Sequence, residues 1–187
     1  MIGYENFDFV PPSVKLTGFV KQPKEELDRR LREYLAYRCG FQEIYTYPWV
    51  HERYINAAAE DSSDWVELEA PPSPEERLLR GSLIPNLLEA SADNLRYFED
   101  FRIFELSQVF HQGSYSPSEP EEILPEMRRE LGGALAGEDP VLLFRQAKGV
   151  IEAMPELLHI EALHFAHEQK PSWADPEMWL NIKNHED

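Results

Sequence analysis

The stretch KEELDRRLREYLAYRCGFQEIYTYP, residues 24–48, decides the fold. In residues 24–39, apolar side chains recur at helical spacing while Arg and Glu fill the other faces, which predicts an amphipathic helix. Pro23 suits the first turn of this helix, and Gly40 suits a left-handed residue that ends it. The apolar residues of the helix are Leu27, Leu31, Tyr34 and Leu35.

Residues 41–47 follow this helix directly and are rich in aromatic and β-branched side chains. This composition is typical of a strand, and Pro48 ends it because proline cannot donate a ladder hydrogen bond. Residues 1–23 are punctuated by proline and predict an extended lead-in. We therefore expect a lead-in over residues 1–23 and one domain over residues 24–187.

The rest of the chain alternates short strands and helices. Residues 101–110 mix apolar and polar side chains, which predicts a long strand in a sheet with one covered face. Shorter strands are predicted at residues 65–69, 78–80, 129–135 and 162–167. The regular βαβ rhythm and glycine-rich turns of a doubly wound fold are missing from the sequence. The pattern therefore predicts an α+β fold with a mainly antiparallel sheet flanked by helices.

Two further helices are predicted. Ser82 is a candidate N-cap, with Pro85 in the first turn of the helix that it starts. A second helix is expected from Pro140, and Pro155 would end or kink it. The helix after Ser82 is expected to bury Ile84, Leu87, Leu88, Leu95 and Phe98.

The charge of the chain excludes some classes of function. Its 187 residues include 18 basic and 35 acidic side chains, for a net charge of −17. Residues 1–60 hold 8 basic and 9 acidic side chains, whereas residues 61–187 hold 10 and 26. Binding to phosphate backbones or anionic lipids needs clustered Lys and Arg. An autonomous nucleic-acid-binding module and a membrane-surface protein are both disfavoured.

The number of cysteines, the spacing of the histidines and the length of the apolar runs disfavour further classes of protein and of site. Cys39 is the only cysteine, so a disulfide within the chain is impossible and a reducing cytoplasm is expected. Apolar runs stay well short of the roughly 20 residues that span a bilayer. His159, His164 and His167 are spaced by five and three residues across a predicted change into a strand. With this spacing, the three side chains are not expected to converge on one metal ion.

Several segments, read together, resemble a known family. Residues 40–48, with the helix before them, resemble the first signature of class II aminoacyl-tRNA synthetases. Other segments are similar to the catalytic-like core of the phenylalanyl-tRNA synthetase beta subunit, and their order agrees with it over roughly residues 24–158. Gly3-Tyr4-Glu5-Asn6 also resembles the linker that leads into that core. The similar segments are residues 79–90, 94–95, 101–110 and 144–153.

The resemblance implies a class II sheet of six or seven strands, and a chain that is part of an enzyme without being its active site. Active class II domains bind ATP phosphates with an Arg after the second-signature strand and another in a glycine-rich third signature. Here His111 stands at the first position, an acidic loop follows over residues 112–125, and the glycine-rich arginine segment is missing before Asp187. We expect no catalytic, cofactor-binding or metal residues. ATP and magnesium would be used by a partner alpha subunit, and tRNA would bind through the whole complex.

The resemblance also suggests which residues have structural or binding roles. In the class II architecture, the first helix and strand build the interface between catalytic modules. The alpha-facing residues would be Leu27, Leu31, Tyr34, Leu35, Phe41, Ile44, Tyr45, Tyr47 and Pro48, although the same side chains could simply form core. Arg80 is interpreted as a structural arginine paired with Glu105 or Glu76, with a ligand contact as the alternative. Arg102 and Glu105 alternate to opposite faces of their strand.

Two functions stay open at this point. The first is a non-catalytic module of a phenylalanine–tRNA ligase beta chain that scaffolds the alpha-subunit catalytic domain. The second is a free-standing, divergent class II synthetase-like protein that binds or ligates a small molecule. The second is kept open by residues 171–181, which replace the His-Pro-Gly-Arg segment expected in the family. Met1 lies inside the linker motif, which favours a piece cut from a longer beta subunit.

Overall fold

The computed structural model describes residues 10–15, 18, 22–113, 124–168 and 170–183. The linker motif at residues 3–6 and most of the acidic loop at residues 112–125 lie outside the described residues. The helices are α1 (Pro23–Glu33), the π-helical turn η2 (Tyr34–Arg38), α2 (Glu52–Ala58), α3 (Ile84–Asn94) and α4 (Pro140–Leu158). The strands are β1 (Gln42–Glu43), β2 (Trp49–Val50), β3 (Leu78–Leu79), β4 (Phe101–His111), β5 (Glu126–Ala136), β6 (His164–Ala166) and β7 (Asn181–Lys183).

A long antiparallel hairpin forms the centre of the fold. Strands β4 and β5 pair over their whole length, from Phe101 with Ala136 to His111 with Glu126. The strands predicted at residues 101–110 and 129–135 are confirmed, and both are longer than expected. Strand β1 adds to the other side of β4 in parallel, which gives the order β1-β4-β5.

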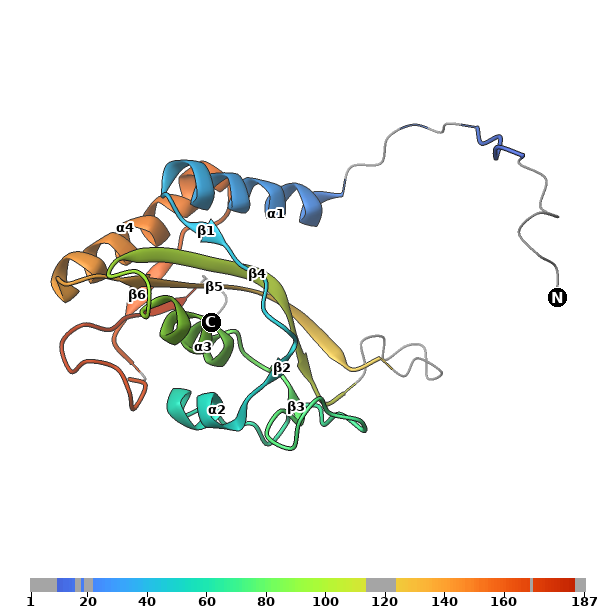
Figure 1. Cartoon of the computed structure of the whole chain (residues 1–187). Coiled ribbons are helices and arrows are strands. Elements are labelled where there is room, and N and C mark those ends of the chain that lie inside the picture. The colour runs from blue at the N-terminus through green and yellow to red at the C-terminus, as the bar shows by residue number, and fades with distance from the viewer. Residues whose placement is uncertain (1–9, 16–17, 19–21, 114–123, 169, 184–187) are drawn as a thin grey trace.

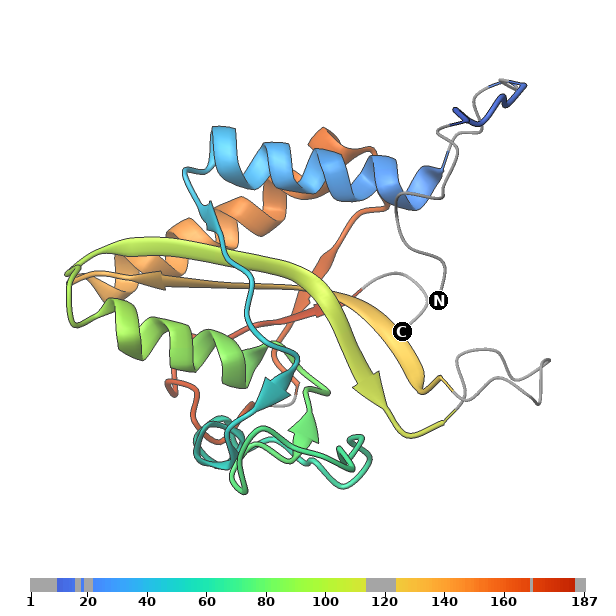
Figure 2. The same cartoon turned by 45° about the vertical axis from the view of Figure 1, so that its right-hand side comes forward.

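Helices cover both faces of this sheet, as Figures 1 and 2 show. Helices α1 and α4 lie together on one face, and α3 lies on the other. Neighbouring residues of β4 pack on opposite faces of the sheet, because side chains alternate along a strand. Phe104 joins a cluster with Tyr34, Leu35, Phe41, Met154 and Leu158. Ile103 joins a second cluster with Leu83, Leu87 and Val109.

The first helix forms as the sequence predicts. Pro23 occupies its first position, and α1 continues into η2 as far as Arg38. Gly40 then adopts a φ of 71°, in the left-handed region that a glycine enters without a Cβ clash. These end signals were readable because they depend on local backbone chemistry alone.

The strand predicted over residues 41–47 is wrong beyond its first residues. Only Gln42 and Glu43 pair with β4, and the chain then leaves the sheet. Thr46 donates its backbone N–H to the side chain of Glu105 instead of to a strand. The strand predicted at residues 65–69 is likewise reduced to two isolated bridges.

The described strands form three separate sheets, not the single sheet of six or seven strands that the resemblance implied. Strand β2 pairs with β3 after Pro48, and β6 pairs with β7 near the end of the chain. Three of the four strand pairings are antiparallel, so the α+β, mainly antiparallel description holds. Within the described residues, no helix is long and apolar enough to cross a membrane.

The predicted buried stripe of the helix after Ser82 is mostly wrong. Leu87 is buried, but Ile84, Leu88, Leu95 and Phe98 are between 36% and 57% exposed. The reason is that α3 turns Leu83 and Leu87 toward the sheet and ends at Asn94, before Leu95 and Phe98. Ser82 accepts a hydrogen bond from the Ile84 N–H, although the cap position is Leu83.

Two other features of the helices differ from the sequence prediction. Pro155 lies inside α4 and does not end it. The helix runs to Leu158 and stops at His159, a left-handed residue with φ 56°. Helix α2 was not predicted, because it is short and only Ile55 and Ala58 are buried.

We expect Gly81→Ala to lower the free energy of unfolding by about 1–3 kcal/mol, because overpacking a filled site costs that much. A Cβ at Gly81 would lie 2.1 Å from Nε1 of the Trp65 indole. Gly149→Ala, on α4 with nothing within 4 Å of the added Cβ, is the matched control. It should raise stability by about 0.5–1 kcal/mol. Urea unfolding checks both variants, and a neutral Gly81→Ala would contradict the close packing against Trp65.

Candidate partner-binding site

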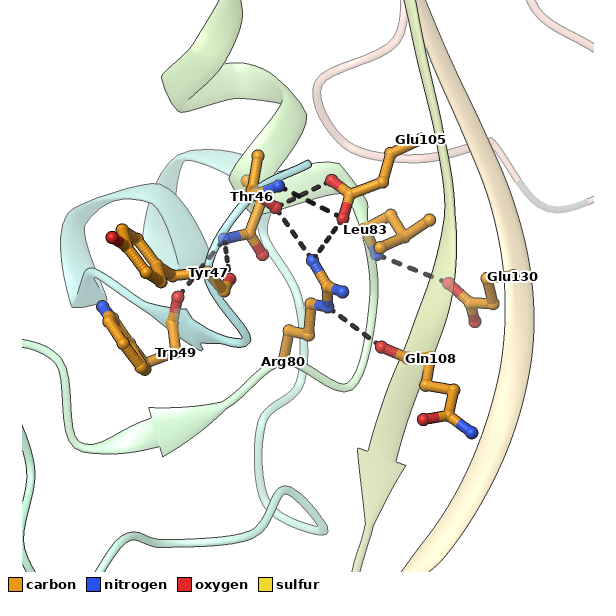
Figure 3. A network of polar contacts seen from close by, with 9 residues as sticks. Thr46, Tyr47, Trp49, Arg80, Leu83, Glu105, Gln108 and Glu130 are labelled. Atoms are coloured by element: carbon orange, nitrogen blue, oxygen red, sulfur yellow. Dashed lines mark hydrogen bonds and ion pairs between the residues drawn. The ribbon is translucent and has the colours of Figure 1, made fainter. Parts of the chain in front are cut away.

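A buried ion pair joins the central strand to the segment that follows β1. Arg80 Nη1 lies 2.8 Å from Glu105 Oε1, and the two side chains are 6% and 0% exposed (Figure 3). Thr46 bridges them, since its hydroxyl donates to Glu105 Oε2 at 2.7 Å and accepts from Arg80 Nη1 at 2.8 Å. Arg80 Nε also donates to the Gln108 carbonyl at 3.0 Å. The structure thus brings Arg80 to Glu105, the first of its two candidate partners.

The backbone of Arg80 strengthens the same connection. Its N–H donates to the Pro48 carbonyl at 2.8 Å, and its carbonyl accepts from the Phe110 N–H at 2.8 Å. A buried charge is tolerated only when it is paired and hydrogen-bonded. Arg80 meets this requirement through Nε and Nη1, and its side chain and backbone together tie three segments of the chain to one another.

The far end of β4 lacks the free arginine that an ATP-binding class II domain uses. His111 Nδ1 lies 2.9 Å from Asp64 Oδ2, and the imidazole is largely covered. Glu130 on β5 is also part-buried, and burial raises the pKa of its carboxyl. Arg128, which is also a charged neighbour of Glu130, is paired with Glu126. The carboxylates of Asp64 and Glu130 would repel a triphosphate placed here.

Arg102, the arginine of β4, lies on the face of the strand opposite to Glu105, as strand alternation requires. Arg102 donates to the Cys39 carbonyl at 2.9 Å and to Gln146 Oε1 at 3.1 Å. In the part of the chain that the structure describes, no three His, Cys, Asp or Glu side chains are grouped so that they could hold a metal ion. This includes His159, His164 and His167.

Part of the predicted interface lies inside the chain's own core. Tyr34, Leu35 and Phe41 are buried in the cluster under α1 and α4, and Leu27 and Leu31 pack partly against it. The Tyr34 hydroxyl donates to the Val150 carbonyl at 2.7 Å. These side chains therefore act on a partner only through the surface that they support.

The rest of the predicted interface includes two exposed aromatic side chains, Tyr45 and Tyr47. Together with the half-buried Trp49, which was not predicted, they form what we call the aromatic strip. Tyr45 and Tyr47 are 73% and 70% exposed. The rings of Tyr47 and Trp49 stack, with centroids 4.4 Å apart and planes at 10°. Ile44 packs partly against the second cluster, and Pro48 is half-buried. The interface role of these residues stays a prediction.

Sequence reasoning missed two members of this site. Trp49 continues the spacing of two residues that relates Tyr45 to Tyr47, and this alternation was the signal that could have revealed it. Asn86 carries no comparable signal in the sequence. Its side chain is 3% exposed and donates to the carbonyls of both Tyr47 and Trp49. Only the three-dimensional structure reveals this contact.

We expect Arg80→Met to lower the free energy of unfolding by about 3–5 kcal/mol, because it leaves the buried Glu105 carboxylate unpaired. Arg80→Met combined with Glu105→Gln should recover part of this loss. Arg77→Met is the control, since its pair with Glu67 is 57% and 63% exposed and is worth at most about 1 kcal/mol. Urea unfolding measures all three variants. Equal losses in Arg80→Met and Arg77→Met would contradict the structural role of Arg80.

Glu130 should make stability depend on pH. Its pKa is raised in the folded chain, so its favourable contribution is complete below the unfolded-state pKa, about 4.3, and is lost as the pH rises through the folded pKa. Glu130→Gln should therefore stabilise the chain at pH 7, with a gain that shrinks toward pH 4. Unfolding at several pH values checks this, and Glu138→Gln, at an exposed position, controls for net charge. A pH-independent gain would contradict burial as the cause.

Residues 10–183 match the family described as the phenylalanyl tRNA synthetase beta chain CLM domain. The phenylalanine–tRNA ligase beta subunit of Geobacter sulfurreducens is 26% identical over 190 residues, covering 97% of this chain and 24% of that protein. The Bacillus licheniformis beta subunit is 29% identical over 183 residues, covering 91% of this chain and 22% of that protein. The chain thus spans about a quarter of the length of these relatives.

Among solved structures, the pyrrolysyl tRNA synthetase PylSc of Desulfitobacterium hafniense has a TM-score of 0.65 at 17% identity. The match covers 87% of this chain and 55% of that one. This likeness concerns the fold alone, and it confirms the class II synthetase-like α+β fold. Since the family match extends over nearly all of the sequence, the chain belongs to the phenylalanyl-tRNA synthetase beta chain CLM domain family.

Proposed function

We propose that this chain is a non-catalytic module of a phenylalanine–tRNA ligase, and that it scaffolds the alpha-subunit catalytic domain. The observation that carries the proposal is the end of β4, where His111 pairs with Asp64 beside Glu130. Adenylate formation requires cations on the transferring phosphates. A site with this charge would oppose ATP binding, so the contribution of the module to the ligase is structural.

The partner follows from the same proposal. The alpha subunit would bind ATP and magnesium and would activate phenylalanine, while tRNA would be held by the complex as a whole. The −17 charge of this chain supports the assignment of tRNA contacts elsewhere. The proposal also places the chain in the cytoplasm.

The surface offered to the alpha subunit would be the edge of the sheet at β1 and the segment after it. Strand β1 is short and lies at the edge of the order β1-β4-β5, where unpaired backbone groups are available to another chain. Tyr45 and Tyr47 follow it directly and are exposed. Residues 1–60 are also nearly neutral, so this end of the chain has less charge to desolvate than the rest.

The chain and the cognate alpha chain, mixed at micromolar concentration, should form a stable complex that is measured by light scattering after size exclusion. The chain alone should not exchange pyrophosphate with ATP in the presence of phenylalanine, because His111 and not an arginine stands at the end of β4, paired with Asp64. Failure to associate with an alpha chain that binds its full-length natural partner would refute the scaffold role.

A second outcome would refute the non-catalytic role. Phenylalanine-dependent exchange by the chain alone, lost in Arg102→Lys, would show that an arginine of β4 serves catalysis. Exchange that survives this substitution would instead be traced to a contaminating ligase. Exchange with another small carboxylic acid would favour the free-standing, ligating alternative.

A further inference from the structure

Two rings of the aromatic strip, those of Tyr45 and Tyr47, are exposed, and the backbone of the strip is fixed by hydrogen bonds. The segment between β1 and β2 has little strand pairing of its own, but its carbonyl groups are fixed from outside. Asn86 Nδ2 donates to the carbonyls of Tyr47 at 3.2 Å and Trp49 at 3.3 Å, and the Arg80 N–H donates to the Pro48 carbonyl between them. Three consecutive carbonyls are thus bound by two buried residues.

This rigidity matters for binding. Ordering a loop and its side chains at an interface costs free energy, and an element that is already ordered avoids this cost. The Tyr47 and Trp49 rings are already stacked before a partner arrives. Tyr and Trp also supply large contact areas while few torsions are immobilised. The strip therefore has the properties of a preformed recognition surface.

The charges around the strip indicate what would bind it. The carboxyl of Glu89, one turn along α3 from Asn86, is part-buried, and burial raises its pKa. Its charged neighbours are Arg53, His51, Asp93 and Glu76, so carboxylates outnumber the permanent cation there. At the other end, the Tyr45 hydroxyl donates to Glu43, which also pairs with Arg32. Arg32 balances the charge of Glu43, so it is the excess of carboxylates around Glu89 that favours a positively charged ligand.

The neighbouring helix already shows the contact that such a ligand would make. The Arg53 guanidinium lies 4.4 Å from the centroid of the Tyr54 ring. Aromatic faces attract cations through the ring quadrupole, most strongly when the cation is an Arg or Lys at a desolvated site. Phosphate-rich RNA would also stack on aromatic rings, but it would be repelled by the acidic chain.

We propose that the aromatic strip docks a basic segment of the alpha subunit, with an Arg or Lys side chain laid over the exposed face of the Tyr47–Trp49 stack. This inference rests on the proposed function and specifies the chemistry of the partner at the interface. The apolar rings supply buried area, and the neighbouring carboxylates select for positive charge.

The test compares aromatic and aliphatic strips. Tyr45→Leu/Tyr47→Leu and Trp49→Leu keep apolar area but remove the aromatic faces, and each should weaken binding to the cognate alpha chain about three- to thirty-fold by calorimetry. Trp173→Leu is the matched control, because Trp173 is 56% exposed and lies in the segment between β6 and β7. It should leave the affinity unchanged. Thermal unfolding of each variant establishes that it is folded.

Salt supplies an independent readout. Raising the ionic strength should weaken binding of the parent chain, and the leucine variants should show a smaller salt effect. If both leucine variants bind the alpha chain with the same affinity as the parent chain, this inference is overturned and the scaffold role still stands. Failure of the parent to bind would overturn both. Strip variants that lose affinity for an oligoribonucleotide, while binding the alpha chain normally, would show that the strip serves RNA instead.

Discussion

A carboxylate with no solvent exposure in the middle of the central strand constrains the rest of this fold. Glu105 is 0% exposed, and a charge in that position must be matched by a partner from outside the strand. Arg80 and Thr46 supply the match. To reach Glu105, the chain after β1 must leave the ladder at Thr46, and the chain after β3 must pass close to β4. The course of residues 46–50 and the start of α3 both follow from this requirement.

The same constraint explains why an irregular segment presents aromatic side chains in fixed positions. A continued β1 would have turned alternate side chains toward the second cluster, beside Ile103. The departure at Thr46 instead leaves Tyr45 and Tyr47 exposed, while Asn86 and Arg80 hold the backbone between them. The surface that we assign to the partner is therefore shaped by buried polar contacts.

The sequence predicted those strands and helix ends that depend on the residue types of a short segment alone. The hairpin strands, Pro23 at the start of α1 and Gly40 after its end were all readable in this way. The structural role of Arg80 was indicated by its position between apolar Leu79 and the start of a helix, but spacing alone could not choose between Glu105 and Glu76 as its partner. The predicted stripe of α3 failed because period alone does not say which of two adjacent apolar faces meets the sheet. The length of β1 was overestimated, because the composition of residues 41–47 does not reveal that a buried carboxylate lies on the neighbouring strand.

The separation of the two ends of β4 explains how a class II fold can lack an active site and still keep an interface. β1 pairs at Ile103 and Phe104, whereas His111 lies seven residues further along, roughly 20 Å away at the usual rise of a strand. The Arg80 network lies between these ends and supports the interface side through Pro48 and Thr46. The His111 side chain pairs with Asp64 at the end of β4 that is remote from β1, so a change of residue at this position leaves the packing at β1 undisturbed. Part of the acidic charge after residue 60, at Glu76, Glu89 and Asp93, lies near α3, which holds the aromatic strip through Asn86, and it favours a positively charged partner there.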